Sequence, residues 1–493
     1  MSAAAAGPIR SILVVGAGIV GRSAAIAFAR ALPTASVGIV ATPPDLTALA
    51  DRLPAALPAT VALLDAIGID EAALVRAGAA SHWLGDRFTA WGSGHPAWVR
   101  GFGDTGIPVA GTSFHQHWLD ARRAGSRTAF HRFNPAAALA EAGRFVHPSG
   151  DERSLLSRFA YGLRIDPGAA MAVIDRQLAA RRVAAFPTRT LGVERASDGS
   201  VGGLVLGDGR AVVADLYIDC SGPAALLAAD DEWDDWSSSI PVDRLLLAER
   251  AAEPALIDDY RAVAIGWRAN WSLGSRAVTG LGYADAITGE ARVRRVFGAG
   301  GAEAAVVALR PGRRPTPWCG NVLALGDAAL VAGPLGLAGF AVAQANLALA
   351  LDLLPQRDFH PLVLGEYNRR VAQRGDRLRD FLALHYLGAR SIRGEFWQAL
   401  HGRTPGPDLA DTLAVFARRG HLPRHEDETY DKQSWLAALL GLGRIPDGRD
   451  PATRNAEPAE IRGTLARLAA AVADLPRSLP PYPDYLARMR NEP

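Results

Sequence analysis

Short apolar runs alternate with a helix-forming segment in the first forty residues. Ser11–Val15 is an aliphatic run that predicts a buried strand, and Arg22–Leu32 predicts a helix that Pro33 ends. Ser36–Val40 repeats the strand pattern. The order strand, helix, strand predicts a βαβ unit and therefore an α/β fold of the Rossmann type.

Further strands are predicted in the middle of the chain. Val183–Gly222 reads as strands and turns, with Asp208-Gly209 as the signal of a hairpin. Ala262–Leu309 is also rich in strand patterns, and Asn321–Leu325 is a short buried strand. Helical patterns dominate afterwards.

Aromatic and histidine residues gather between about residues 75 and 160, among many glycine and proline turns. Such a segment is typical of an aromatic-lined pocket. We therefore expect a first module over 1–360 with a β-rich substrate region inserted at about 75–160 and 235–310. A helical C-terminal region is expected over 361–493.

Charge and cysteine content exclude several classes of protein. The 53 basic and 51 acidic residues leave a net charge of only +2, which predicts no nucleic-acid partner and no anionic membrane partner. The two cysteines, Cys220 and Cys319, lack metal-binding spacing, and no apolar run is long enough to span a membrane. We expect a soluble, cytoplasmic protein without a metal centre. Lys432 is its single lysine.

A glycine-rich turn joins the first strand to the first helix. In this position Gly16 permits the tight turn, Gly18 lets a pyrophosphate approach the backbone, and Gly21 lets helix and strand pack closely. The helix N-terminus offers unpaired N–H groups to the phosphates. The predicted dinucleotide-binding residues are Gly16, Ala17, Gly18, Val20 and Gly21.

The second strand lacks the acidic residue that usually accepts the ribose hydroxyls. Ala41–Pro44 stands at that place, and Asp45 is the nearest carboxylate. We therefore expect the dinucleotide to be held loosely.

A second motif favours FAD over a nicotinamide cofactor. The strand at Asn321–Leu325 ends in Gly326-Asp327, and a glycine-rich turn and a helix from about Ala338 follow. Asp327 is expected to accept hydrogen bonds from the ribityl or phosphate side, although a role as a helix cap is the alternative. The helix N-terminus would stabilise the reduced flavin. The residues predicted to bind FAD here are Gly326, Asp327, Pro334, Gly336, Leu337, Ala338 and Gly339.

The order and spacing of these and other motifs resemble the flavin-dependent tryptophan halogenase family, within the FAD monooxygenases of GR2-like fold. The resemblance covers nearly the whole chain. Its motifs are Gly16–Gly21, Phe114–Leu119, Ala214–Gly222, Ile240–Arg244, Gly266-Trp267, Asn270-Trp271, Gly326-Asp327, Glu366–Asn368, Arg379–Phe381, His385-Tyr386, Ser434-Trp435 and Gly441–Gly443.

Three departures from the family pattern argue against halogenation. The resemblance implies a lysine that handles hypohalous acid, but Trp83 occupies that position within His82–Phe88. An indole can neither form a haloamine nor donate a cationic hydrogen bond. The family's Pro-Leu-Glu-Ser-Thr-Gly run, which supplies a catalytic carboxylate, is replaced by Pro334–Gly339, with Gly336 at the carboxylate position. The Trp-x-Trp-x-Ile-Pro signature is altered over Trp267–Leu273. We therefore expect no halogenase activity.

Oxygen activation by reduced flavin does not need the missing groups. A flavin C4a-hydroperoxide could transfer oxygen directly to an electron-rich ring, which is aromatic hydroxylation. In this respect the chain is similar to flavoprotein monooxygenases that hydroxylate a protein tryptophan in tryptophylquinone biogenesis of quinohemoprotein amine dehydrogenase. The implied partner is a protein or peptide that carries a tryptophan. The alternatives are a small-molecule aromatic hydroxylase of secondary metabolism and an inactive flavin-binding maturation factor.

Candidate catalytic residues lie in the aromatic segment. His95, His115 and His117 could deprotonate a developing phenol or orient an indole, although lone histidines are more often structural. Asp86 and Trp83 are candidates by analogy, Trp83 chiefly as a stacking wall. The only other glycine cluster, at 298–301, lacks the spacing of a second dinucleotide site. We therefore expect a separate flavin reductase that uses NAD(P)H as the partner that reduces FAD.

Overall fold

The computed structural model describes residues 7–92, 96–228, 232–251, 253–298, 300–388 and 392–491. Its contacts divide the chain into two compact units, each built from three separate segments. Unit 1 comprises Met1–Ala80, Arg164–Ser237 and Val307–Asp376, and unit 2 comprises Ser81–Leu163, Ser238–Val306 and Arg377–Pro493. Whether 1–360 forms a module of its own stays a prediction.

A parallel sheet forms the centre of unit 1. β1 (Ser11–Val15) lies between β2 (Ser36–Ala41) and β12 (Leu216–Asp219), and is parallel to both. β8 (Ala184–Pro187) extends the sheet beside β2, and β21 (Val322–Ala324) extends it beside β12. The predicted Rossmann-type βαβ unit is therefore confirmed.

The first helix starts earlier than the sequence pattern predicts. α1 runs over Ile19–Ala31, whereas the prediction placed its start at Arg22. The last residues of the glycine motif already form the first helical turn, because Arg22 N–H donates to Gly18 O. The predicted hairpin at Asp208-Gly209 is present between β10 (Val201–Leu206) and β11 (Ala211–Val212).

The other elements that lie entirely in unit 1 are helices, strand β20 at the edge of the parallel sheet, and strands of smaller three-stranded sheets. Helices α1 and α9 contact each other, and α1 also contacts α7. These elements are α2 (Leu49–Arg52), β3 (Ala55–Ala56), α3 (Pro58–Ile67), α4 (Glu71–Arg76), α7 (Pro167–Ala180), β9 (Leu191–Arg195), β13 (Asp234–Asp235), β19 (Gly312–Arg313), β20 (Trp318–Cys319), β22 (Leu330–Val331) and α9 (Gly339–Asp352).

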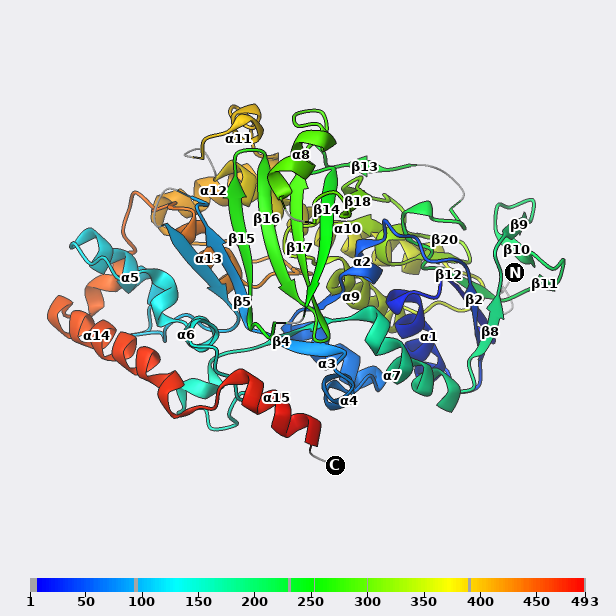
Figure 1. Cartoon of the computed structure of the whole chain (residues 1–493), viewed down its shortest axis with the longest axis horizontal. Coiled ribbons are helices and arrows are strands. Elements are labelled where there is room, and N and C mark those ends of the chain that lie inside the picture. The colour runs from blue at the N-terminus through cyan, green and yellow to red at the C-terminus, as the bar shows by residue number, and fades with distance from the viewer. Residues whose placement is uncertain are drawn as a thin grey trace. The chain divides into compact units, whose positions relative to one another are not determined.

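Unit 2 contains a large, mostly antiparallel sheet (Figure 1). The order of its strands runs from β14 through β17, β16, β15 and β5 to β6. The strands are β5 (Gly85–Thr89), β6 (Ala97–Gly101), β14 (Arg244–Ala251), β15 (Ile257–Val263), β16 (Gly266–Ser272) and β17 (Arg276–Tyr283). The predicted strand-rich region 262–309 is only partly correct, because its second half contains α8 (Glu290–Phe297).

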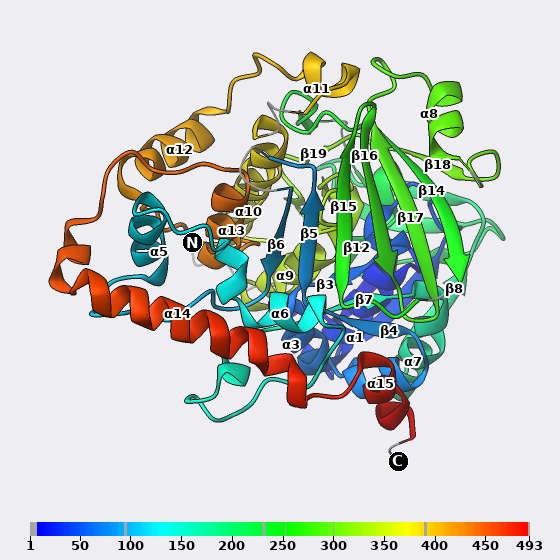
Figure 2. The ribbon, with the colours of Figure 1, turned by 60° about the vertical axis from the view of Figure 1, so that its left-hand side comes forward.

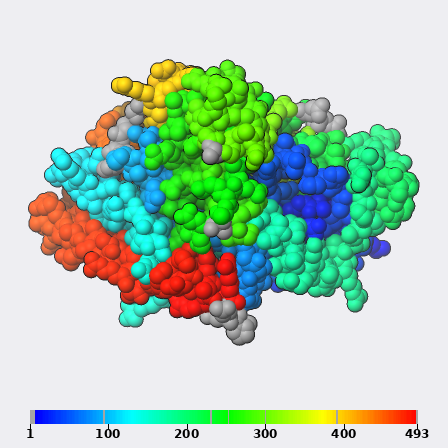
Figure 3. All heavy atoms as spheres, in the orientation of Figure 1, coloured from blue at the N-terminus to red at the C-terminus, as the bar shows by residue number. Residues whose placement is uncertain are grey.

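Helices make up most of the C-terminal part, as predicted. Figure 2 shows the long helix α14 beside α5 and α6, and Figure 3 shows side chains of the same segments in contact on the surface. The helices that lie entirely in unit 2 are α5 (Phe114–Arg123), α6 (Pro135–Glu141), α8, α11 (Glu395–Ala399), α12 (Pro407–Arg419), α13 (Lys432–Gly441), α14 (Pro458–Asp474) and α15 (Tyr482–Asn491). The remaining elements are β4 (Ala80–Trp83), β7 (Gly162–Ile165), β18 (Ala305–Ala308) and α10 (Pro361–Leu387).

Among the helices of the described ranges, none is both long and apolar enough to cross a membrane.

Candidate functional site

The glycine turn of unit 1 has the geometry that the motif predicts. Gly16 has a φ of +105°, and its N–H donates to Val40 O at 3.0 Å. A Cβ at Gly16 would lie 2.2 Å from Cys220 O, and a Cβ at Gly21 would lie 2.0 Å from Gly16 O. Both positions therefore exclude every residue with a side chain. The turn and the close packing of helix and strand depend on these two glycines.

The second glycine of the motif faces a carboxylate of the same unit. A Cβ at Gly18 would lie 2.2 Å from the Asp51 carboxyl carbon. Val20 N–H donates to Asp51 Oδ1 at 2.8 Å, so the carboxylate sits on the N-terminus of α1. Burial raises the pKa of Asp51 to about 6, against hydrogen bonds from the backbone of Val20 and Ile19 that lower it. The helix N-terminus thus holds an anionic group where a dinucleotide would place its phosphates, so this end of the motif fits the predicted ligand.

Asp327, the predicted ribityl ligand, is buried in the turn Gly326–Ala328. Its Oδ2 accepts a hydrogen bond from Ala50 N at 3.1 Å, within the short helix α2. Burial raises the pKa of Asp327 to about 7, and the negative charge of Asp51 adds to the shift. The structure thus realises the alternative role of a helix cap, although for α2 rather than for the helix that follows Asp327. Binding of a ribityl chain stays a prediction.

The buried loop before α9 contains two residues in the left-handed region of backbone conformation. Gly336 has a φ of +76° and Leu337 has a φ of +50°. A left-handed leucine costs about 1–2 kcal/mol. α9 begins at Gly339 after Ala338, which has no side-chain cap, so its first N–H groups are available to a ligand. Binding of flavin by Pro334–Gly339 stays a prediction.

Trp83 lies in the core of unit 2. Its side chain is 1% exposed, its indole N–H donates to Gly85 O at 2.8 Å, and its ring meets the edge of Phe102 at 4.6 Å. The indole is therefore held from several directions. Its role as a wall for a substrate stays a prediction.

Asp86 forms a buried ion pair that the sequence analysis did not identify. Asp86 on β5 lies directly opposite Arg100 on β6, and their side chains are hydrogen-bonded and only 0–1% exposed. The Arg100 guanidinium also lies 4.4 Å from the centre of the Tyr430 ring. Asp86 Oδ1 and Arg100 Nη1 have no hydrogen-bond partner among the described residues. Buried polar atoms without partners are uncommon in folded proteins, and these two lie side by side in one ion pair.

His385 adds a neutral acceptor to this group. Its Nδ1 lies 2.9 Å from Phe381 O, which places the proton on Nδ1. Burial and the Arg100 charge lower the pKa of His385 to about 3, so the imidazole is neutral. Its Nε2, with no partner in the described part of the chain, is a bare acceptor. We call Asp86, Arg100, His385 and Tyr430 the polar centre of unit 2.

The other candidate histidines have structural contacts. On α5, His115 Nε2 lies 2.9 Å from Gly420 O and His117 Nε2 lies 3.0 Å from Val109 O. Burial lowers the pKa of His115 to about 4. Both rings therefore hold neighbouring loops, and a catalytic role for either stays a prediction. His95 lies outside the described residues.

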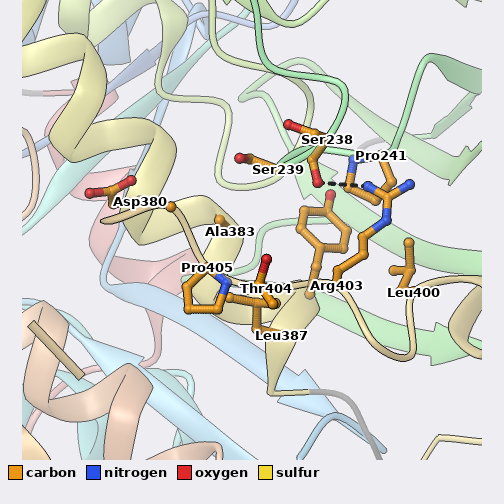
Figure 4. Close-up of a pocket in the computed structure, with 12 residues that line it drawn as sticks. Ser238, Ser239, Pro241, Asp380, Ala383, Leu387, Leu400, Arg403, Thr404 and Pro405 are labelled. Atoms are coloured by element: carbon orange, nitrogen blue, oxygen red, sulfur yellow. Dashed lines mark hydrogen bonds between the residues drawn. The ribbon is translucent and has the colours of Figure 1, made fainter. Parts of the chain in front are cut away.

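A small cavity of unit 2 is too small for an aromatic substrate. Figure 4 shows Arg403 reaching the Ser238 carbonyl, at 2.8 Å, with Thr404 and Pro405 beside it. The free volume is about 10 Å³, which is room for about one water molecule.

The sequence of residues 11–458 matches the family of tryptophan halogenases. The chain belongs to the tryptophan halogenase family. Enzymes of this class are FAD-dependent oxidoreductases. A separate flavin reductase, which uses NAD(P)H, provides them with reduced FAD. The expectations of a flavin enzyme, of FAD and of an external reductase are thereby confirmed at the level of the family.

Individual relatives are distant in sequence. The chain is 26% identical over 365 residues to a 7-chloro-L-tryptophan 6-halogenase of Kutzneria sp. (strain 744), covering 69% of this chain and 66% of that protein. It is 28% identical over 294 residues to a tryptophan 6-halogenase of Streptomyces toxytricini, covering 56% of each. The chain thus spans between about half and two thirds of these relatives.

The fold is much more similar than the sequence. A flavin-dependent halogenase from Brevundimonas sp. BAL3 superposes with a TM-score of 0.90 at 29% identity, over 98% of this chain and 99% of that one. A flavin-dependent halogenase from Xanthomonas campestris has the same TM-score at 24% identity, over 99% of each chain. The expected fold class is therefore confirmed.

Proposed function

We propose that this member of the halogenase family binds FAD in unit 1 and inserts oxygen, rather than a halogen, into an electron-rich aromatic ring. The observation that carries the proposal is the buried Trp83 at the position where the family pattern has a lysine. The single lysine of the chain, Lys432, is the first residue of α13. Gly336 likewise stands where the family pattern has a carboxylate.

The chemistry needs no residue beyond those present. Reduced FAD, when bound, supplies two electrons to O2, so that one oxygen atom enters a ring C–H bond and the other leaves as water. The glycine turn at Gly16 and the N-termini of α1 and α9 would hold the cofactor. These groups bind and orient FAD without side-chain acid or base.

The polar centre of unit 2 is our proposed polar end of the substrate site; its side chains are almost fully buried, so a ring would reach His385 only after neighbouring side chains move. His385 Nε2 is a neutral acceptor that could receive an indole N–H or a ring hydroxyl, and the Asp86–Arg100 pair sets the charge beside it. The ring centres of Phe88 and Phe381 each lie 5.1 Å from the ring centre of His385. Such surroundings favour a flat apolar ring with one polar edge.

The finer proposal is that the ring belongs to a tryptophan of a protein or peptide, modified during quinone cofactor biogenesis. A polypeptide can supply binding energy far from the reacting ring, so the pocket needs no groups for a free carboxylate and ammonium. The second candidate is a small-molecule aromatic hydroxylase, and the third is a maturation factor that binds flavin without catalysis.

One experiment separates these possibilities. The protein is mixed with FAD, a flavin reductase, NADH, chloride, bromide and ¹⁸O2, together with free tryptophan or a tryptophan-containing subunit. The proposal expects ¹⁸O in the product and no halogen, and the finer proposal expects it in the polypeptide. Enzyme-dependent chlorination or bromination would overturn the proposal. Turnover of free tryptophan alone would overturn only the finer proposal, and lack of any product would favour the maturation factor.

A further inference from the structure

The carboxylate of Asp51 covers Gly18 and accepts a hydrogen bond from Val20 N–H at the start of α1. We propose that Asp51 competes with FAD, because its carboxylate takes the place of the cofactor's pyrophosphate until residues 45–52 move it away. This inference rests on the proposed FAD site in unit 1 and says how that site is controlled.

The contacts of Asp51 leave no room for both anions. The position of a Cβ on Gly18 is 2.2 Å from the Asp51 carboxyl carbon, so the carboxylate covers the surface of Gly18 that the pyrophosphate would approach. Val20 has a single N–H, which Asp51 Oδ1 accepts at 2.8 Å. A phosphate oxygen would need that same proton at about 2.9 Å. The two anions therefore exclude each other.

The segment that carries Asp51 has hydrogen bonds of its own. Asp45 Oδ1 accepts from Thr47 N at 2.8 Å and from Thr47 Oγ1 at 2.6 Å, and the Arg52 guanidinium donates to Leu46 O at 2.9 Å. Hydrogen bonds from the backbone of Ala50 and Leu49 to Asp327, and the burial of both residues, tie the segment to the rest of unit 1. For FAD to bind, residues 45–52 would have to give up these contacts and shift with their internal hydrogen bonds intact.

Electrostatics keep Asp51 only weakly in place. Asp45 and Asp327 both add negative charge near the Asp51 carboxylate. The charge of Asp51 in turn helps to raise the pKa of the Cys220 thiol. Burial raises the pKa of Asp51 to about 6, so the buried carboxylate is disfavoured at neutral pH relative to one in water. A pyrophosphate carries more charge to the same helix N-terminus and can displace it.

This arrangement suits an enzyme that exchanges flavin with a separate reductase. Oxidised and reduced FAD carry the same pyrophosphate, so Asp51 competes with both. The competition lowers the affinity for both forms, which lets spent flavin leave. Competition by Asp51 is thus a second reason to expect loose FAD binding, besides the missing acidic residue after β2.

The test compares FAD binding to the full chain and to three variants. Asp51→Ala removes the competitor, Asp51→Asn keeps its shape without the charge, and Asp45→Ala removes a neighbouring carboxylate whose hydrogen bonds go to Thr47. Dissociation constants for oxidised FAD are measured by calorimetry, and melting temperatures are measured with and without FAD.

We expect Asp51→Ala to tighten FAD binding by about five- to thirtyfold, the effect of one charged helix cap. Asp51→Asn should tighten it less, and Asp45→Ala by less than about twofold. Without FAD, Asp51→Ala should melt at a lower temperature than the wild type because α1 loses its cap, and FAD should raise its melting temperature more.

The outcomes separate this inference from the proposed function. If the wild type binds FAD and Asp51→Ala binds it equally or more weakly, competition by Asp51 is overturned while the FAD site stands. Equal tightening by Asp45→Ala would show a general charge effect and also overturn it. If neither the wild type nor any folded variant binds FAD, the proposed function itself fails.

Discussion

Removing Arg100 from the polar centre of unit 2 should destabilise the protein severely. Asp86 and Arg100 are 0% and 1% exposed, and each is the other's only charged hydrogen-bond partner within the described ranges. Arg100→Met keeps most of the side-chain volume but leaves the Asp86 carboxylate buried without a counter-ion. Breaking a buried pair in this way costs about 3–5 kcal/mol. Loss of the guanidinium above Tyr430 adds to the cost, by about 0.5–2 kcal/mol.

Strand β5, which carries Asp86, provides a matched control. Arg87 pairs with Asp259 at 3.1 Å, and their side chains are 30% and 43% exposed. Arg87→Met should therefore cost at most about 1 kcal/mol. The assay is urea unfolding followed by tryptophan fluorescence, with the double variant Asp86→Asn/Arg100→Met included. Because this variant buries no lone charge, it should recover part of the loss.

An unpaired buried carboxylate can also escape by taking up a proton. The loss in Arg100→Met should therefore be smaller at about pH 5 than at about pH 8. The reasoning is refuted if Arg100→Met and Arg87→Met lose the same free energy of unfolding. It is refuted too if the double variant is as unstable as Arg100→Met at both pH values.

Three further predictions concern the glycine turn, the buried carboxylates and the lysine position. Gly16→Ala places a Cβ 2.2 Å from Cys220 O, so calorimetry should show no binding of added FAD under conditions in which the wild type binds it, and wild-type affinity would contradict this. Asp51 and Asp327 have raised pKa values of about 6 and about 7, so the stability they contribute without FAD is present below about pH 4 and is lost as pH rises toward 7. Asp51→Asn/Asp327→Asn should flatten the fall in melting temperature over this range, and an unchanged slope would speak against both assignments. Trp83→Lys buries an ammonium in place of a 1%-exposed indole, so it should lower the melting temperature sharply without creating halogenase activity, which mass spectrometry of tryptophan with chloride would detect.

The sequence by itself determined the parts that depend on neighbouring residues. The βαβ unit at 11–41 follows from two apolar runs and a glycine turn, and the hairpin at Asp208-Gly209 follows from the turn dipeptide. The positive φ of Gly16 is likewise a local requirement of that turn. Hydrophobic periodicity and backbone sterics act over a few residues, so these features can be predicted without knowledge of the rest of the chain.

Only the tertiary structure decided which polar groups meet. Asp51 is 31 residues from Val20 and reaches it because α2 folds over the end of α1. Asp327 accepts a hydrogen bond from Ala50 N of α2, which is 277 positions away. Asp86 and Arg100 are opposite each other only because β5 and β6 pair in one register. Neither partner carries a local signal of its burial, since an aspartate or arginine in an amphipathic segment is usually solvated. The contacts of Asp51 with α1 and the Asp86–Arg100 ion pair are therefore set by long-range packing. Residues so far apart in the sequence share no local pattern from which these contacts could be predicted.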